Sequence, residues 1–245
     1  MEFYDTFDEN GVFMTSEDDY DVHYKGLWHK VIRIWLYDEE GNLYLRVRNE
    51  DKKLDAINEL HMRSSESISS CFDRGMFEKL GIHFPATSNF ELASMRKVRV
   101  HKVYSDNSEL KDNYFLCNYI GQFDNDTNFF IFSKDTAGLV QISAKGIITL
   151  LKNRTGEIVG YPVNPNGIDY DSKKLISIDE IYEESDEDTF DKYSQIVDAI
   201  SAISQRHQKE MAEQEKLKKL AQKVAKNDKK EIHSHADDNE GSDIY

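Results

Sequence analysis

The chain has 245 residues, 39% of them hydrophobic, which predicts one folded domain of about 170 residues with an appendage. Its formal net charge of −15 argues against nucleic acid as the main partner, because phosphate binding needs a basic surface. No apolar run approaches the roughly 18 to 20 residues of a membrane span, the N-terminus lacks a signal-peptide pattern, and the two cysteines show no pairing pattern, so we expect a cytoplasmic protein without membrane contact.

The N-terminal part of the chain predicts two strand pairs. Asn10 and Gly11 form the strongest two-residue signal for a hairpin, and they separate two short apolar-aromatic stretches. A second pair follows, with strands over residues 28–37 and 43–48 around a turn at 40–42. Apolar residues alternate along the first of these strands, which therefore has at least one buried face.

Residues 66–80 predict an amphipathic helix that packs against the sheet. The apolar positions recur at helical spacing and are Ile68, Cys71 or Phe72, Met76 and Leu80. We expect Ser64 or Ser65 as the N-cap and Glu66 in the first turn, where the helix dipole favours a negative charge. Gly81 is expected to end the helix.

The next part of the chain predicts further strands and one more helix. Strands are expected over residues 95–103 and 113–121, on either side of a polar hairpin loop at 105–112. The remaining predicted features are a short apolar run at 129–132, an acidic segment at 134–142 before a strand or loop, a helix at 144–151 and an extended segment at 156–163.

The C-terminal third is polar and strongly charged. We expect an acidic linker over residues 164–188, a helix over 189–226 and a disordered tail over 227–245. The helix has coiled-coil spacing with polar residues in its middle, so two interpretations stay open. Either its first turns dock on the domain and the rest is solvated, or residues 190–226 mediate self-association or bind a protein partner. In both cases we expect residues 1–163 to fold cooperatively without the segment 190–245.

The predicted helix and the segment before it resemble the Nudix box. That pattern is glycine, five residues, glutamate, seven residues, then Arg-Glu-apolar-any-Glu-Glu-any-Gly-apolar. Counted back from Gly81, the spacing is intact and the matching polar residues are Glu66, Arg74 and Glu78. The box is nevertheless degenerate: Leu60 replaces the first glycine, Gly75 the glutamate after the arginine, and Lys79 the last glutamate.

Other motifs narrow the resemblance to the isopentenyl-diphosphate-isomerase-like branch of the Nudix family. They are Asp-Glu-Asn-Gly at 8–11, Gly-x-x-His at 26–29, a strand ending at Arg48 and a Lys-Lys pair at 52–53. The resemblance covers residues 1–163 and implies an α+β fold, namely a Nudix-type α/β/α sandwich with a mixed β-sheet. Here this domain is followed by the long C-terminal helix.

The resemblance also implies a metal site. The residues that fall where these isomerases supply metal-binding histidines are His23, His29 and His61, although His23 lies one residue closer to His29 than the pattern requires. Imidazole is a ligand suited to zinc or manganese. The isomerase cysteine falls at Glu59, and its downstream glutamates fall near Asp112 and Tyr114. Without the cysteine we do not expect isomerase activity.

Further candidate residues follow from the box. Glu66 and Glu78 are expected either to hold Mg²⁺ or Mn²⁺ with substrate oxygens, if the protein is active, or to have structural roles beside Arg74 and the helix dipole. Asp135 matches an acidic position that acts as general base in this family. A basic cluster lies where the family approaches its diphosphate substrate, and its proposed substrate-binding members are Arg46, Arg48 and Lys53.

Three functions stay open from the sequence. The first is binding of a nucleoside- or isoprenoid-diphosphate-type small molecule, without need of a metal cofactor and with little or no hydrolysis. The second is metal-dependent diphosphohydrolysis by Glu66, Glu78 and Asp135, and the third is an interaction scaffold that acts through the C-terminal helix. On the first interpretation, the double substitution Gly75→Glu and Lys79→Glu is expected to tighten magnesium binding at least about tenfold by restoring carboxylates.

Overall fold

The computed structural model describes residues 2–83, 90–103, 105, 109–123, 130–184 and 188–236, with side chains up to residue 219. The chain divides into two compact units, Met1–Ile200 and Ser201–Tyr245. Among the helices of the described residues, none is long and apolar enough to cross a membrane. The first unit contains the sheets and every candidate site residue.

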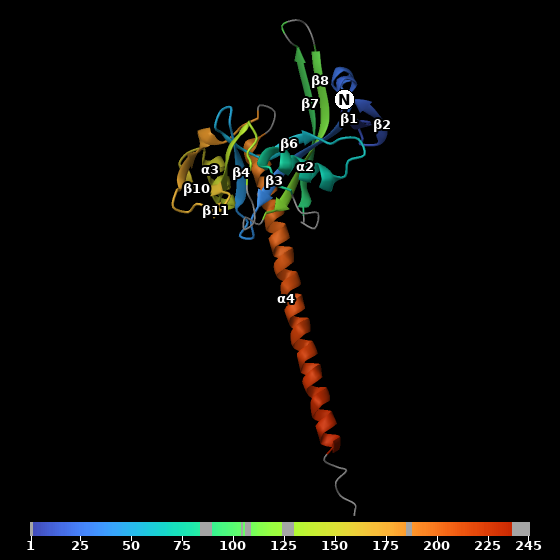
Figure 1. Ribbon diagram of the computed structural model, residues 1–245, viewed down its shortest axis with the longest axis vertical. Coiled ribbons are helices and arrows are strands. Elements are labelled where there is room, and N and C mark those ends of the chain that lie inside the picture. The colour runs from blue at the N-terminus through green and yellow to red at the C-terminus, as the bar shows by residue number, and fades with distance from the viewer. Residues whose placement is uncertain are drawn as a thin grey trace, which may run out of the picture. The chain divides into compact units, whose positions relative to one another are not determined.

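A mixed β-sheet forms the centre of the first unit (Figure 1). The order along its main path is β11-β10-β9-β4-β3-β8-β7, in which β3 and β8 are parallel and the other neighbours antiparallel. Its strands are β3 (His29–Tyr37), β4 (Leu43–Arg48), β5 (Leu54–Asp55), β6 (Asn58–His61), β7 (Phe90–Val103), β8 (Glu109–Gln122), β9 (Thr136–Ile142), β10 (Glu157–Asn164), β11 (Gly167–Ile168) and β12 (Lys174–Ser177). With the helices and the long C-terminal helix, this sheet confirms the predicted α+β fold class.

The N-terminal hairpin is a separate two-stranded sheet beside the main one. It pairs β1 (Phe3–Phe7) with β2 (Phe13–Asp18), as the Asn10-Gly11 signal predicts. Gly11 has a positive φ of 85°, and the Asp8 carboxylate accepts bonds from the backbone N–H groups of Asn10 and Val12. The hairpin leads into helix α1 (Asp19–Lys25), which ends at Gly26.

Alternate residues of β3 face two different helices. Ile32, Ile34 and Leu36 are buried in the main core, which also contains the apolar face of α2 (Ile68–Leu80). The intervening Trp35 faces the opposite side, where its ring lies 5.1 Å from that of Tyr193 at the start of α4 (Thr189–Ala236). The sheet is thus covered by helices on both faces, while α3 (Ala144–Asn153) packs at β10.

The box helix begins later than the sequence predicts. Its N-cap is Ser67, whose hydroxyl accepts a bond from the N–H of Ser70 at 3.1 Å, so the prediction of Ser64 or Ser65 was wrong. Glu66 therefore lies before the helix and not in its first turn. The predicted end is confirmed, because Gly81 adopts a left-handed conformation with φ 68°.

The segment after residue 163 contributes to the first unit. The stretch expected to be a linker contains β11, β12 and the 3₁₀ turn Ile178–Glu180. The helix α4 continues through Ala236, ten residues beyond the end predicted at 226, and residues 237–245 lie outside the described residues. The predicted loop at 105–112 and the apolar run at 129–132 lie partly outside them too. Within that loop, Asp112 belongs to β8.

Candidate metal centre

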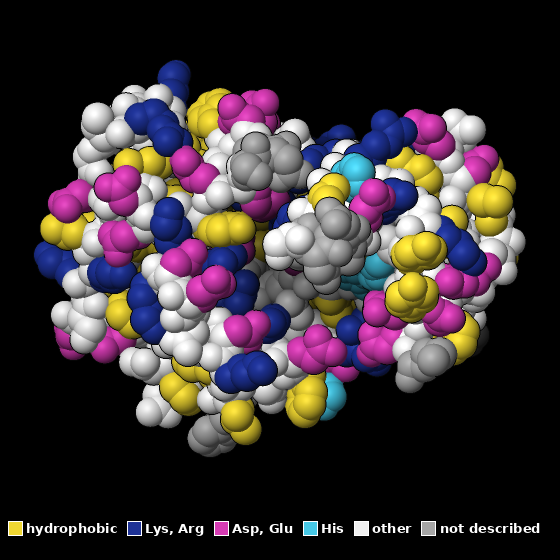
Figure 2. Space-filling model, turned by 90° about the horizontal axis from the view of Figure 1, so that it is seen from above, with side chains coloured by type: hydrophobic (Ala, Val, Ile, Leu, Met, Phe, Trp, Pro, Cys, Tyr) yellow, Lys and Arg dark blue, Asp and Glu magenta, His cyan; other side chains and the backbone are white. Residues whose placement is uncertain are grey.

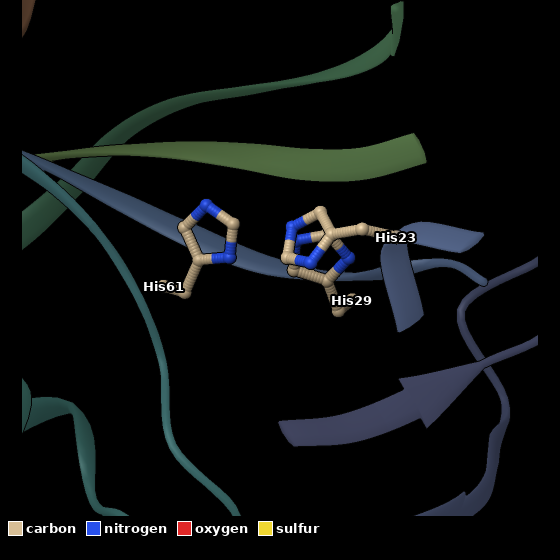
Figure 3. A group of neighbouring side chains, drawn as sticks. All are labelled: His23, His29 and His61. Carbon is tan, nitrogen blue, oxygen red and sulfur yellow. The ribbon is translucent and has the colours of Figure 1, made fainter. Parts of the chain in front are cut away.

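Three histidines predicted as metal ligands come together at one end of the sheet (Figure 3). His23 lies on α1, His29 begins β3, and His61 ends β6, where it pairs with Val31 of β3. One ring nitrogen of each histidine lies within 4.8 Å of those of the other two. Among the residues that the structure describes, this is the group whose side chains are placed to share a metal ion.

Asp112 provides a fourth donor beside the histidines. Its Oδ1 lies 3.7 Å from His23 Nε2 and 3.5 Å from His29 Nε2. A tetrahedral zinc site with bonds of about 2.1 Å separates its ligand atoms by about 3.4 Å. The carboxylate and these two imidazoles are therefore spaced as metal ligands are. The resemblance placed an isomerase glutamate near Asp112 but did not identify Asp112 itself as a ligand. No local pattern in the sequence shows that this position faces the histidines.

Buried atoms of this cluster lack hydrogen-bond partners. They are His29 Nε2, His61 Nδ1 and Asp112 Oδ1, each inaccessible to solvent. A buried polar atom without a partner costs roughly 1 to 3 kcal/mol. A bound cation would satisfy all three atoms at once, so the donor set fits a divalent transition metal.

Backbone carbonyls orient two of the imidazoles. His29 Nδ1 lies 3.1 Å from the carbonyl oxygen of Leu27, and His23 Nδ1 lies 2.7 Å from that of Asp19. A proton on each Nδ1 leaves the lone pair on Nε2, the atom that faces Asp112. Metal-binding histidines are commonly held in this way by a partner of the second ring nitrogen.

Burial keeps His29 and His61 neutral by lowering their pKa values. It lowers the pKa of His29 to about 3 and that of His61 to about 4, with neighbouring histidines as a further cause. Neutral imidazole is the form that binds metal. Burial also raises the pKa of Asp112 above its ordinary value. The ring of Tyr4 covers the cluster, with its centroid 5.3 Å from that of His61.

Acid is expected to destabilise the metal-free protein through His29. Its folded-state pKa of about 3 lies below the ordinary 6.5. Between these two pH values His29 is therefore protonated in the unfolded chain and neutral in the folded chain. The contribution of neutral His29 to the free energy of unfolding is fully present above pH 6.5 and is lost as the pH falls towards 3. From pH 7.5 to 5.0 the loss is about 2 kcal/mol. Urea denaturation at both pH values measures it.

The matched comparison for this prediction is His29→Gln, which removes the titrating ring. Between pH 7.5 and 5.0, the free energy of unfolding of this variant should fall by about 2 kcal/mol less than that of the wild type. Carboxylates with lowered pKa values, such as Asp135, change the free energy of unfolding mainly below about pH 5. They therefore do not affect the difference between the two proteins over this interval. An equal pH dependence in both proteins would show that His29 does not carry the effect.

A cavity of about 460 Å³ leads to the cluster from solvent. It is lined by residues of α1, the end of β6 and the start of β8: Asp19, Tyr20, His23, Tyr24, His61, Glu109, Leu110 and Asp112. Small-molecule sites occupy cavities of roughly 300 to 1,000 Å³. The volume thus admits a small ligand that contacts three of the four candidate metal ligands.

The box helix lacks the carboxylate at Gly75 because the space is filled by other side chains. A Cβ added to Gly75 would lie 2.5 Å from Ile34 Cδ1 and 3.1 Å from Leu60 Cδ2, both buried. Leu60 itself stands where the box has its first glycine. Leu60 and Gly75 are therefore complementary in shape: the side chain of Leu60 lies where a Cβ at position 75 would be crowded.

Glu66 and Glu78 are bound to Arg74. Arg74 donates to both carboxylate oxygens of Glu66, at 2.8 and 2.9 Å, and reaches Glu78 Oε1 at 3.3 Å. The N–H of Arg63 also donates to Glu66, at 3.0 Å. Arg74 further donates to the carbonyl oxygen of His61 at 2.9 Å. These contacts favour the structural roles, in which the box residues hold the strand that carries a metal-centre histidine.

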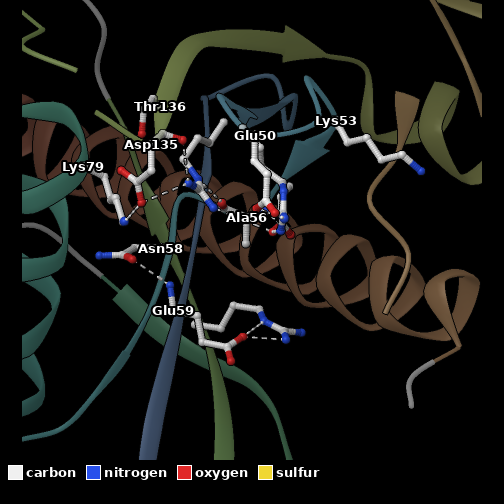
Figure 4. Close-up of polar contacts among 12 residues, drawn as sticks. Glu50, Lys53, Ala56, Asn58, Glu59, Lys79, Asp135 and Thr136 are labelled. Carbon is white, nitrogen blue, oxygen red and sulfur yellow. Dashed lines mark hydrogen bonds and ion pairs between the residues drawn. The ribbon is translucent and has the colours of Figure 1, made fainter. Parts of the chain in front are cut away.

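Asp135 forms an ion pair with Lys79, the third departure from the box (Figure 4). Ser133 also donates to this carboxylate, and Arg46 Nη1 lies 3.7 Å from it. Burial raises the pKa of Asp135, but the bonds from Lys79 and Ser133 outweigh it and lower the pKa to about 2. A general base at neutral pH needs a higher pKa, so this setting disfavours the catalytic role.

Two of the three proposed substrate-binding cations, Arg46 and Arg48, have acidic partners on the protein and share Asp55. Arg46 lies 3.8 Å from Asp55 as well as near Asp135, and Arg48 forms ion pairs with acidic residues of the following turn. Arg48 also stacks on the ring of Tyr182 at 3.8 Å. Lys53 extends away from the Lys79–Asp135 pair (Figure 4). The structure thus does not bring these three cations together around one open site.

Comparisons with known proteins gave structural likenesses only. No family model matches the sequence, and no curated protein matches it. A Deinococcus radiodurans protein, DR0079, is 16% identical with a TM-score of 0.43, over 62% of this chain and 89% of that one. A MutT protein from Methanosarcina mazei is 15% identical with a TM-score of 0.35, over 50% and 81%. A MutT/nudix family protein from Enterococcus faecalis is 12% identical with a TM-score of 0.39, over 71% and 61%.

Proposed function

We propose that this chain is a Nudix-type protein that binds a divalent transition metal and, beside it, a diphosphate-bearing small molecule, with little or no hydrolysis. The observation that carries the proposal is the cluster of His23, His29, His61 and Asp112, with its unpartnered buried atoms. Zinc or manganese suits such a set of imidazoles and one carboxylate.

The proposed metal and the cavity beside it support a phosphate-bearing class of ligand. A bound divalent metal acts as a Lewis acid that attracts phosphate oxygens. The chain itself supplies the cavity wall, where Tyr20 and Tyr24 stack with centroids 5.4 Å apart. On the face shown in Figure 2, Lys and Arg side chains are interspersed with Asp and Glu. This mixture disfavours a nucleic acid, which needs a continuous basic surface.

Loss of one ligand is expected to weaken metal binding. In His61→Gln, the zinc or manganese affinity should fall at least about a hundredfold, or 2.7 kcal/mol, because a buried imidazole donor is lost. Isothermal titration calorimetry of the EDTA-treated protein measures the affinity, and Co²⁺ absorption reports the donor set. His83→Gln is the matched control, since His83 is exposed and pairs with Asp73. Equal affinities of both variants would reject the metal centre.

Hydrolysis by the box is the alternative, and we expect it to be weak. Removing one preorganised charge-stabilising group typically costs an enzyme 10² to 10³ in rate. Here Gly75 and Lys79 replace two carboxylates, and Arg74 binds the two that remain. Turnover of nucleoside and isoprenoid diphosphates with Mg²⁺ or Mn²⁺ should be at least about a hundredfold below that of an intact family member. Robust turnover that disappears in Glu78→Gln would instead establish the hydrolase.

A scaffold role for the second unit is the remaining candidate. Met211 and Leu217 on α4 are 62% and 65% exposed, and such apolar side chains on a long helix suit contact with another helix. If the helix self-associates, the full chain should elute as a dimer in light-scattering chromatography and a chain ending at Ile200 as a monomer. If both chains elute as monomers, the helix does not self-associate, and binding of a different protein is the scaffold role that remains.

A further inference from the structure

Three cations converge on the carboxylate of Glu184, away from the metal centre. Arg33 Nη2 lies 2.7 Å from Glu184 Oε2, Lys192 Nζ lies 2.9 Å from Oε1, and Arg96 Nη2 lies 3.6 Å from Oε2. These cations come from β3, α4 and β7, which are far apart in the sequence. The chain thus assembles a positively charged cradle from three elements and fills it with one of its own acidic side chains.

Two of the three cations are buried, whereas the side chain of Arg96 is 28% exposed. The side chains of Arg33 and Lys192 are 3% and 0% exposed. Arg33 also binds Glu59, with Nε and Nη2 at 2.7 and 2.6 Å from Glu59 Oε2, so its guanidinium is held between Glu59 and Glu184 (Figure 4 shows the Glu59 end). Burial raises the pKa of Glu184, but the charges of Arg33 and Lys192 outweigh it and lower the pKa to about 2.

An open cavity of about 570 Å³ borders this cradle. Its wall includes Glu184 and residues from α3, the segment before α4 and the first turn of α4: Leu151, Lys152, Arg154, Glu183, Asp188, Thr189 and Phe190. Glu184 is the residue of the cradle that lines this cavity, so a ligand there reaches Arg33, Arg96 and Lys192 only when the Glu184 side chain moves aside. The volume lies in the range of small-molecule sites.

We propose that Arg33, Arg96 and Lys192 form a binding site for the phosphate group of a small molecule, and that Glu184 occupies it until such a ligand from the bordering cavity replaces the carboxylate. Buried arginine is the preferred protein partner of both carboxylate and phosphate, since its parallel N–H groups match their oxygens. A phosphate carries more charge and one more oxygen than a carboxylate, and three cations can bind it together. The site shares no residue with the metal centre.

The test uses the full chain treated with EDTA, so that metal plays no part. Calorimetry with inorganic phosphate and with pyrophosphate, at constant ionic strength in KCl, compares the wild type with Glu184→Gln. This variant removes the competing charge and keeps the side-chain volume. We expect it to bind at least one of the two anions at least tenfold more tightly than the wild type does, and the gain to disappear in Glu184→Gln/Lys192→Met.

The matched control is Glu180→Gln, which removes the same charge from a residue outside the cavity wall, whose partner is Lys174. Its affinity should stay within twofold of wild type. A second measurement uses the melting temperature: phosphate should raise it more in Glu184→Gln than in Glu180→Gln, because the general stabilisation by phosphate is the same in both variants. The proposal is overturned if Glu184→Gln and Glu180→Gln bind the anions equally, or if phosphate raises the melting temperatures of both variants equally.

Discussion

Gly75→Glu is expected to destabilise the protein by at least about 4 kcal/mol. Overpacking a core costs roughly 1 to 3 kcal/mol, and burying an unpaired carboxylate adds a desolvation penalty of several more. At Gly75 both costs apply, because the new Cβ would meet Ile34 Cδ1 at 2.5 Å and the carboxylate would enter the space of Leu60. The total is a large part of the stability of an ordinary domain. Urea denaturation measures it.

Phe77→Glu provides the matched control on the same helix. Phe77 is 52% exposed and contacts the exposed ring of His83, so this variant should lose no more than about 1 kcal/mol. If Gly75→Glu and Phe77→Glu proved equally stable, the prediction would be wrong, because the side chains around Gly75 would be able to rearrange at little cost. The sequence-based expectation that Gly75→Glu with Lys79→Glu rebuilds a magnesium site is thus corrected. Position 75 faces the core, and Lys79→Glu would place a second carboxylate beside Asp135.

The same helix shows what the sequence can and cannot predict. Its apolar spacing predicted the buried residues Phe72, Met76 and Leu80, because helical periodicity is a local property. The cap was misplaced by two or three residues, since Ser64, Ser65 and Ser67 all have side chains able to cap. The reason for Gly75 was not predictable, because Leu60 and Ile34 meet it only in three dimensions.

The sequence likewise predicted some residues of the candidate metal centre and missed another. The resemblance singled out His23, His29 and His61 from their positions in the sequence, and the structure brings them together. Asp112 was not chosen, because the polar segment around it predicts a loop, whereas β8 extends through it and turns its carboxylate towards the histidines. The Arg33–Glu184 contact spans 151 positions, and no local pattern indicates it.

Truncation at two positions is expected to separate the two compact units. A chain that ends at Ile200 should keep its cooperative melting, because the first unit is complete at that residue. A chain that ends at Asp188 should lose at least about 5 kcal/mol or fail to fold, since burial of each large apolar side chain contributes about 1.5 to 3 kcal/mol. The lost side chains include Tyr193, Ile196 and Ile200, which are 0 to 3% exposed.

This expectation replaces the sequence-based one, in which the whole segment 190–245 was dispensable. Loss of the segment uncovers Trp35, a fully buried residue whose ring packs on Tyr193, and removes Lys192 from Glu184. Calorimetric melting of both truncated chains measures the difference. In the full chain, Tyr193→Ala should cost about 3 to 5 kcal/mol, while Met211→Ala, at an exposed position, should cost less than about 0.5. Cooperative melting of the chain ending at Asp188, at the temperature of the longer one, would show that the sheet keeps its core without α4.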